Sequence, residues 1–268
     1  MMIMMIMMRP SCWAVGWAAE PARSLWFCCL LVALCCCPLQ AASRQHVDPD
    51  EGTLSSVKPR IPEPMVVDLV RPLGAARGEV EVNSLFRFLP ATRPRTLQWA
   101  PEVEYAFREG YGVEFEIPAQ NGAVEAWKGA LQGTLRGPWR RSFIHGWQLL
   151  AEKNRGHGSS KVDALYLAGV RWHPRWSAFT MSGLEREGGV RPARAWLGNY
   201  SLFYHRRDAL HYGLESNWKG RGNSGRALLV MPQAHFRVNR LNFQLGAGWQ
   251  QTARARGVQI GWRLSREF

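Results

Sequence analysis

The residues that decide the fold stand at the end of the chain, in 241-LNFQLGAGWQ-250 and 257-GVQIGWRLSREF-268. In the first stretch, apolar residues occupy the odd positions and polar or small residues the even ones. The second stretch separates in the same way, with Val258, Ile260, Trp262, Leu264 and Phe268 on one face and Gln259, Gly261, Arg263 and Ser265 on the other. A helix would mix these sets, because its same-face neighbours recur every three to four residues. Alternation with period two predicts two β-strands, each with one apolar face.

The same alternation extends backward to residue 79. The expected strands are 79–89, 96–107, 111–117, 124–135, 142–152, 162–173, 176–187, 194–206, 210–219, 226–238, 241–250 and 257–268. The segment 176–187 is ambiguous on both faces, and 111–117 is short. Most of the others reach the roughly 9–11 residues that a tilted strand needs to cross a bilayer. The sequence therefore predicts an all-β fold, a transmembrane antiparallel up-and-down β-barrel of about 12 strands.

The connections between these strands alternate in length. The longer ones include 90-PATRPR-95, 153-KNRGHGSSK-161, 188-GGVRP-192 and 221-RGNSG-225, and the shorter ones include 108-REG-110, Pro174–Arg175 and Asn239–Arg240. Only 137-GPWRR-141 does not fit the alternation. Bacterial barrels have short periplasmic turns and long outer loops. The alternation therefore predicts which end of the barrel is the inner one, and it is not expected of a soluble sandwich.

Tryptophans gather at the expected strand ends. Near the longer connections lie Trp99, Trp127, Trp196, Trp218 and Trp249, and beside the short ones lie Trp139, Trp172 and Trp176 with Tyr204. Two belts of such rings are typical of the two membrane interfaces. The alternative is that they are ordinary core aromatics of a β-sandwich.

The N-terminal part has a different character. Arg9 and Arg23 precede an apolar stretch at 25–39, and small residues follow at 41–43. This layout predicts a signal peptide at 1–43 rather than a retained anchor, because the apolar stretch is shorter than a membrane-spanning helix. All cysteines lie within it, at Cys12, Cys28, Cys29, Cys35, Cys36 and Cys37. Residues 44–78 contain several prolines and predict a flexible mature N-terminus, and 79–268 form the barrel. Within 44–78, 65-MVVDLVRPL-73 is either a short strand or a segment that enters the lumen.

The inward faces of the expected strands carry charges of both signs. Joining the second and third strands by a loop at 108–110, with Gly110 left-handed, pairs Phe107 with Tyr111 and places apolar residues on one face. This register sets Glu102 opposite Glu116 and Glu104 opposite Glu114. Inward parity also applies to Arg87, Lys128, Arg171, Arg237 and Arg263, with Arg108 at the turn. Two interpretations remain open: the charges lock a filled lumen, or they form a constriction that selects solutes.

Other function classes find little support in the sequence. The net charge is +13, but the basic residues are spread along the chain, so no nucleic-acid partner is expected. We find no motif for a cofactor, a metal or a catalytic centre. His211 and Ser216 have opposite strand parity, and His145, His173, His205 and His235 are isolated along the sequence. An enzyme is therefore not expected.

Two stretches resemble known proteins. The C-terminal Phe268, preceded at alternate positions by Leu264, Trp262 and Ile260, is similar to the ending of outer-membrane proteins that the barrel-assembly machinery reads; Arg266 departs from that pattern. The stretch 99-WAPEVEYAFREGYGVEFEIP-118 resembles the repeated hairpin of the phenol meta-cleavage-pathway outer-membrane family, as does 66–89 more faintly. This resemblance implies a transport-like barrel with no catalytic residues to carry over.

The function expected from these observations is a passive channel or transport-related barrel in the outer membrane, with a charged lumen and a small solute. Its other expected partners are outer-membrane lipid and the barrel-assembly machinery. The alternatives are a lumen-filled structural or surface-interaction barrel that conducts nothing, and a soluble periplasmic β-protein.

Overall fold

The structure is a computed structural model that describes residues 59–67, 69–135, 142–156, 159–189, 192–220, 226–252 and 256–268. All of them belong to one compact unit, Gln40–Phe268. The expected signal peptide, residues 44–58 and Trp139 lie outside the described residues. No described helix is long and apolar enough to cross a membrane.

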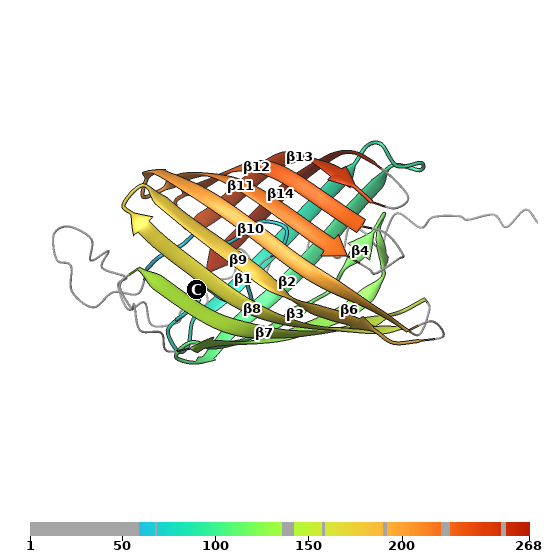
Figure 1. Cartoon of the computed structure of the whole chain (residues 1–268), viewed down its shortest axis with the longest axis horizontal. Helices are drawn as coiled ribbons and strands as arrows, with labels where there is room; N and C mark the ends of the chain where they lie inside the picture. The colour runs from blue at the N-terminus through green and yellow to red at the C-terminus, as the bar shows by residue number, and fades with distance from the viewer. Residues whose placement is uncertain are drawn as a thin grey trace, which may run out of the picture. The chain divides into compact units, whose positions relative to one another are not determined.

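The described chain forms a closed antiparallel barrel of twelve long strands (Figure 1). Each long strand pairs with its neighbours along the chain, and β1 closes the ring by pairing with both β2 and β14. The long strands are β1 (Val80–Leu89), β2 (Thr96–Arg108), β3 (Tyr111–Glu116), β6 (Ala126–Leu135), β7 (Phe143–Asn154), β8 (Ser160–His173), β9 (Trp176–Glu187), β10 (Ala193–Arg207), β11 (Leu210–Gly220), β12 (Arg226–Val238), β13 (Leu241–Gln251) and β14 (Arg256–Glu267). The short pieces β4 (Ala119–Gln120) and β5 (Ala123–Val124) form a small hairpin beside β2. The predicted fold class is confirmed.

The connections have the predicted alternation. Adjacent strands meet across 109–110, 174–175, 208–209 and 239–240 at one end of the barrel, which we call the inner end. Connections at the other end, the outer end, span 90–95, 117–125, 155–159, 188–192, 221–225 and 252–255. The connection 136–142 is again the long exception at the inner end.

The two faces of the wall differ as the alternation predicts. On β2, Val103 is 49% exposed and Tyr105 is 42% exposed, whereas their neighbours Glu102 and Glu104 are buried. Large apolar side chains are exposed in this way on every long strand except β1. A barrel covered with exposed apolar side chains fits lipid rather than water.

The β2–β3 hairpin has the predicted register but a different turn. Glu102 pairs with Glu116, Glu104 with Glu114, and Tyr105 with Val113. The predicted pairing of Phe107 with Tyr111 is wrong: Tyr111 pairs with Arg108 across a two-residue turn, and an irregularity between Tyr105 and Arg108 restores the register. Gly110 has a φ of 74°, the left-handed conformation that the sequence predicted.

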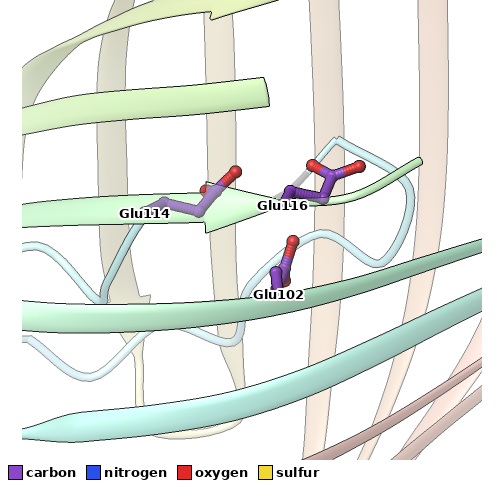
Figure 2. Close-up of side chains that lie close together, drawn as sticks. All are labelled: Glu102, Glu114 and Glu116. Carbon is purple, nitrogen blue, oxygen red and sulfur yellow. The ribbon is translucent and has the colours of Figure 1, made fainter. Parts of the chain in front are cut away.

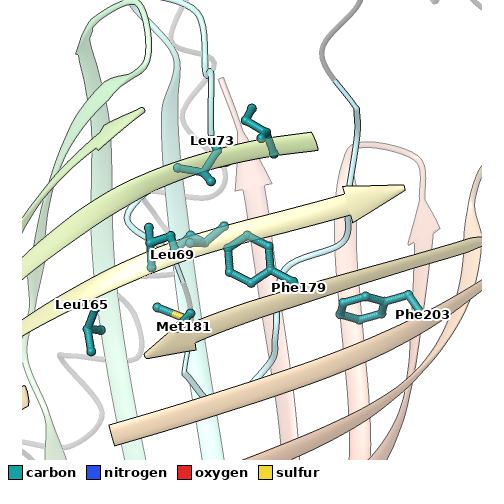
Figure 3. Packing of buried hydrophobic residues seen from close by; sticks show 8 residues of the cluster. Leu69, Leu73, Leu165, Phe179, Met181 and Phe203 are labelled. Atoms are coloured by element: carbon teal, nitrogen blue, oxygen red, sulfur yellow. The ribbon is translucent and has the colours of Figure 1, made fainter. Parts of the chain in front are cut away.

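Residues 59–67 and 69–78, which we call the plug segment, enter the barrel, and the buried residues of the segment lie between positions 64 and 75. The described residues of 65–73 enter the lumen and form no strand, so of the two interpretations of this stretch the lumenal one holds. Its Leu69 and Leu73 are buried in one cluster with Leu165, Phe179 and Phe203 of the wall (Figure 3). The sequence predicted flexibility here from prolines and polar residues, but inward apolar side chains of β8, β9 and β10 provide a surface on which the segment packs.

The course of the plug segment follows from its contacts. The Arg60 carbonyl accepts a bond from Arg171, close to the inner turn 174–175. Met65 is fully buried in the barrel, in one cluster with Met231 and Leu229. At the end of the segment, the Gly78 amide donates to the Ala106 carbonyl at 2.7 Å, again near the inner end. The segment therefore rises from the inner end and returns to it.

Candidate functional site: a plugged, charged lumen

Arg71 is the most heavily coordinated side chain of the plug segment. Its guanidinium contacts Glu81 at 2.6 Å, Glu79 at 3.0 Å, Glu267 at 3.1 Å and Glu104 at 3.6 Å. Burial by itself lowers the pKa of Arg71, but nearby carboxylates, chiefly those of Glu81 and Glu104, raise it above its ordinary value, so the side chain stays charged. One cation of the plug segment thus ties together β1 and both strands that pair with it, β2 and β14.

Glu215 on β11 holds the part of the plug segment around Met65. Its carboxylate accepts the backbone N–H groups of Met65 at 2.8 Å, Val66 at 3.2 Å and Val67 at 3.3 Å. The side-chain amides of Asn199 and Asn217 also donate to it, at 2.8 and 2.7 Å. A fully buried carboxylate is stable when it accepts several such bonds. Glu215 therefore fixes the backbone of residues 65–67 deep in the lumen.

Arg263 on β14 joins the plug segment to the acidic part of the wall. Its guanidinium donates to Glu102 at 3.1 Å, to the Asn83 oxygen at 3.0 Å and to the Pro64 carbonyl at 3.3 Å. It also lies 3.7 Å from the carboxylate of Glu63. Burial, together with the nearby Glu81 carboxylate, raises the pKa of Glu63 to about 7, against the opposing effect of the arginines.

Three carboxylates of the predicted charge cluster come together on β2 and β3. Figure 2 shows Glu102 on β2 with its carboxyl group turned toward Glu116, and Glu114 beside it on β3. Their oxygens lie within 4.8 Å of one another, a spacing that suits a metal ion. However, the Lys128 ammonium contacts both Glu114, at 3.2 Å, and Glu116, and Arg263 contacts Glu102. Because each of the three carboxylates already contacts one of these two cations, we assign no metal to this cluster.

The other predicted charges separate into two groups. Arg87 lines the lumen near the outer end, as its parity predicted. Arg108 is exposed at the inner turn beside the Tyr111 ring, Arg171 bonds to carbonyls near the inner turn 174–175, and Arg237 is exposed and donates to Asn242. These three arginines therefore lie at the inner rim and do not join the carboxylates.

The predicted interface tryptophans differ in their exposure. Six of them are exposed: Trp127, Trp172, Trp176, Trp196, Trp218 and Trp249. Trp99 is half-buried because it stacks on Phe86, with ring centroids 5.9 Å apart, and donates to the Ser84 hydroxyl. At the C-terminus, Trp262 also stacks on Phe86, and the Phe268 amide donates to Val80.

A chamber lies between the plug segment and the outer end. It is a cavity of about 480 Å³ whose lining includes Val66 and Val67 of the plug segment. Its wall carries carboxylates, among them Glu116, Glu152, Asp163 and Glu185, and the cations Arg87, Lys128, Lys161 and Lys219. The size is within the range typical of small-molecule sites. We call this cavity the outer chamber.

The sequence did not reveal a row of histidines across three strands. His205, His211 and His235 are register partners on β10, β11 and β12, so they are not isolated as predicted. The His205 ring bonds to the Ser177 hydroxyl at 2.8 Å. Among the described residues no carboxylate contacts His205, and Ser177 has no exposed surface, so this pair lacks the acidic partner and the access of a catalytic serine. Only the strand registers, which the sequence did not provide, bring these histidines together.

No family model matches the amino-acid sequence, and no curated protein matches it either. Several solved structures have a similar fold. The NanC porin matches with a TM-score of 0.52 at 8% identity, over 69% of this chain and 97% of its own. The KdgM porin matches with a TM-score of 0.50 at 10% identity, over 70% of this chain and 98% of its own. The COG4313 outer membrane channel from Pseudomonas putida F1 matches with a TM-score of 0.52 at 12% identity, over 75% of this chain and 100% of its own. At these identities the likeness shows the fold, that of outer-membrane β-barrels; the narrower resemblance to the phenol meta-cleavage-pathway family stays a prediction.

Proposed function

We propose that this chain is an outer-membrane channel for small polar solutes whose inner half is closed by its own plug segment. The observation that carries the proposal is the outer chamber, a charged cavity lined on one side by Val66 and Val67 of that segment. A solute enters the outer chamber, and its passage requires the plug segment to leave its place. The barrel lies in the outer membrane with the exposed apolar face toward lipid.

The contacts of the plug segment support a movable closure. Besides its apolar packing, it is held by a few polar anchors, namely Arg71, Arg263 and Glu215, and by single bonds such as those to Gln132 and Thr134. Polar anchors of this kind respond to ionic conditions and pH, whereas a core packed only by apolar side chains does not. The similar fold of the porins named above agrees with transport as the general role.

A disulfide between the plug segment and the wall tests the proposal. No cysteine follows Cys37, so the barrel has no thiol of its own. A Cβ built at Gly112 on β3 would lie 3.2 Å from Val70 Cγ1, the position that a cysteine sulfur at residue 70 can occupy, so a disulfide can join the two residues. Protein carrying Val70→Cys and Gly112→Cys is purified from membranes and placed in planar lipid bilayers.

We expect openings under applied voltage in the reduced protein and none in the oxidised protein. The Val70→Cys single variant is the control and should be indifferent to oxidation. Equal conductance of the double variant in both redox states would show that the plug segment is not the closure.

A second candidate is the lumen-filled barrel that conducts nothing. The observation in its favour is the completeness of the filling: Met65, Val70 and Arg71 are almost fully buried. This candidate predicts no openings in the wild type or in the reduced double-cysteine variant at any voltage. Such a result would replace the channel by a structural barrel.

The C-terminal strand supplies the proposed assembly signal. Trp262 and Leu264 lie at alternate positions of β14, Phe268 directly follows it, and β14 is the strand that closes the ring with β1. A strand that is last in the chain and pairs with the first is well placed to be recognised by the barrel-assembly machinery before closure.

A further inference from the structure

We propose that the outer chamber binds a small zwitterion with its charges at opposite ends, such as a short peptide, with the solute's carboxylate on Arg87 and its ammonium on Asp163. The inference names the solute class of the channel proposed above and rests on that function. Arg87 and Asp163 both line the chamber, and neither forms an ion pair with another described residue.

Most charges around the outer chamber are already paired. Lys161 lies 2.7 Å from Glu152, and Lys219 lies 2.5 Å from Glu185. Lys128 is held between two glutamates of β3. A solute would bind these paired charges weakly, because its own charged group would have to break an ion pair that is already formed.

Arg87 is different. It is half-buried on β1, its neighbours in register are Gln98 on β2 and Gly261 on β14, and it lines the chamber. No carboxylate of the described residues lies within ion-pair distance of it. Neither register neighbour carries a charge, and Gly261 places no side chain beside the guanidinium. A guanidinium in such a place suits a carboxylate that accepts two parallel hydrogen bonds.

Asp163 is the matching anion. It is buried on β8, and its Oδ1 has no hydrogen-bond donor among the described residues. Its partners in register are Leu150 and Glu185, and the charge of Glu185 is balanced by Lys219. Lys161 and Lys219 act on its charge from a greater distance, but no described cation lies within ion-pair distance of it, so a solute ammonium in direct contact would stabilise it.

The order of strands places these two groups across the lumen from each other. Between β1 and β8 lie four long strands on one side of the ring and six on the other. A cation on one wall and an anion on the nearly opposite wall fit a solute with opposite charges at its two ends. A simple anion would satisfy Arg87 and leave Asp163 unpaired, and a simple cation would do the reverse.

Neutral polar groups complete the site. Among the described residues, Oε1 of Gln148, Oε1 of Gln250 and Nε2 of Gln259 are buried without a hydrogen-bond partner, and all three residues line the chamber. Unmade hydrogen bonds of this kind suit a solute with an amide between its charged ends. A cavity of about 480 Å³ accommodates a molecule the size of a dipeptide.

Three probes of similar size test the inference by calorimetry on the detergent-solubilised full barrel: glycylglycine, N-acetylglycylglycine and glycylglycinamide. The first is a zwitterion, the second lacks the ammonium and the third lacks the carboxylate. We expect glycylglycine to bind about tenfold or more tightly than either of the others, because each lost contact is a hydrogen bond between charged groups.

Substitutions then identify which residue binds the carboxylate of the solute and which binds its ammonium. Arg87→Gln should remove the preference for glycylglycine over glycylglycinamide, and Asp163→Asn the preference over N-acetylglycylglycine. Arg108→Gln, at the exposed inner turn, is the matched control and should change none of the three affinities. Should a variant fail to fold, the ranking of the three probes on the wild type still decides the matter.

Two outcomes would overturn the inference. One is equal binding of glycylglycine and N-acetylglycylglycine, which would mean that Arg87 alone forms an anion site. The other is no binding of any probe by a barrel that conducts, which would leave the proposed channel standing and remove its solute class. Conversely, the expected ranking in a barrel that never conducts would support the site while refuting the channel.

Discussion

Arg71 brings a single guanidinium into contact with four carboxylates that come from around the start of β1, from β2 and from the end of β14. Removing one partner of a buried charge network leaves the others uncompensated, which costs about 3–5 kcal/mol. Arg71→Met should therefore release the plug segment. The readout is maleimide labelling of the thiol introduced by Val70→Cys, because Val70 has no exposed surface while the segment is in place.

The expected increase in labelling is at least about a hundredfold, since each 1.4 kcal/mol corresponds to a factor of ten. Arg77→Gln, also combined with Val70→Cys, is the control, because Arg77 belongs to the same segment and is exposed. Unchanged labelling in Arg71→Met would mean that the other polar anchors and the apolar contacts hold the segment without Arg71.

Glu63 makes the position of the plug segment sensitive to pH. Its pKa is about 7 in place and about 4.5 when free in solution. A carboxyl whose pKa is higher in the docked state stabilises docking fully below its free pKa and loses that contribution as the pH rises through about 7. Because the thiolate is the reacting form, labelling of the Val70→Cys variant is divided at each pH by the labelling of the same thiol in unfolded protein. This ratio should increase between pH 5 and pH 8, by an amount corresponding to about 1–3 kcal/mol. Glu63→Gln should flatten this part of the profile, and a profile unchanged by that substitution would assign the effect to another group.

The arginine at position 266, where the C-terminal pattern favours an aromatic residue, is explained by its contact with Phe268. The structure places the Arg266 guanidinium 4.7 Å from the centre of the Phe268 ring. A cation over an aromatic face is stabilised by about 0.5–1 kcal/mol at an exposed site, and a long side chain can reach the membrane edge. We expect Phe268→Ala to lower the amount of folded barrel in the outer membrane, and Arg266→Ala to change it little, as measured by the folded fraction on unheated gels. Equal yields for Phe268→Ala and the wild type would remove Phe268 from the assembly signal.

At the scale of elements, the wall could be predicted from the sequence to within a few residues because lipid and lumen impose opposite polarity on alternate positions. β9 is the strand whose two faces could not be assigned from the sequence. Residues 176–187 are ambiguous on both faces because Phe179 and Met181 pack inward with the plug segment while the other face meets lipid. Apolar residues on the inward face of β9 thus indicate a filled lumen, but this meaning becomes clear only when the plug segment is known to pack there.

Two glycines make room for the plug segment. A Cβ at Gly261 on β14, or at Gly246 on β13, would lie 2.8 Å from Met65 Cε. Gly261→Val should displace Met65 and weaken docking by about 1–3 kcal/mol, the usual cost of an overfilled core. Labelling at position 70 in the Val70→Cys background should rise accordingly, and adding Met65→Ala should restore protection. If the second substitution brings no recovery, the strain lies in the strand and not at Met65.

At the scale of the whole molecule, the barrel could be predicted and the site only in part. The pairing of Glu102 with Glu116 follows from local alternation. The contact of Met65 with Glu215 joins residues 150 positions apart, and nothing periodic in residues 59–78 shows it. Charges such as Arg171 and Arg237 had the right parity but the wrong height, because parity determines the face of a strand and not the distance along the barrel axis.

A closed barrel with a lipid-facing exterior also predicts how the protein behaves as a unit. We expect it in the outer-membrane fraction, with folded protein that migrates differently on gels before and after boiling. The double-cysteine variant should unfold at a higher temperature when oxidised than when reduced, because the cross-link restricts the unfolded chain by about 2–4 kcal/mol. Recovery of the wild type in the soluble periplasm would instead support the soluble β-protein.

The plug segment has both its ends at the same mouth of the barrel, near Arg171 on one side and Ala106 on the other. The backbone of the segment therefore never threads the cylinder, and no crossing of chains prevents its withdrawal. A steady force applied at Pro59 from the inner end would draw the segment out without opening the seam between β1 and β14. Tension on the segment from the inner side should therefore remove it from the lumen and leave the barrel wall intact.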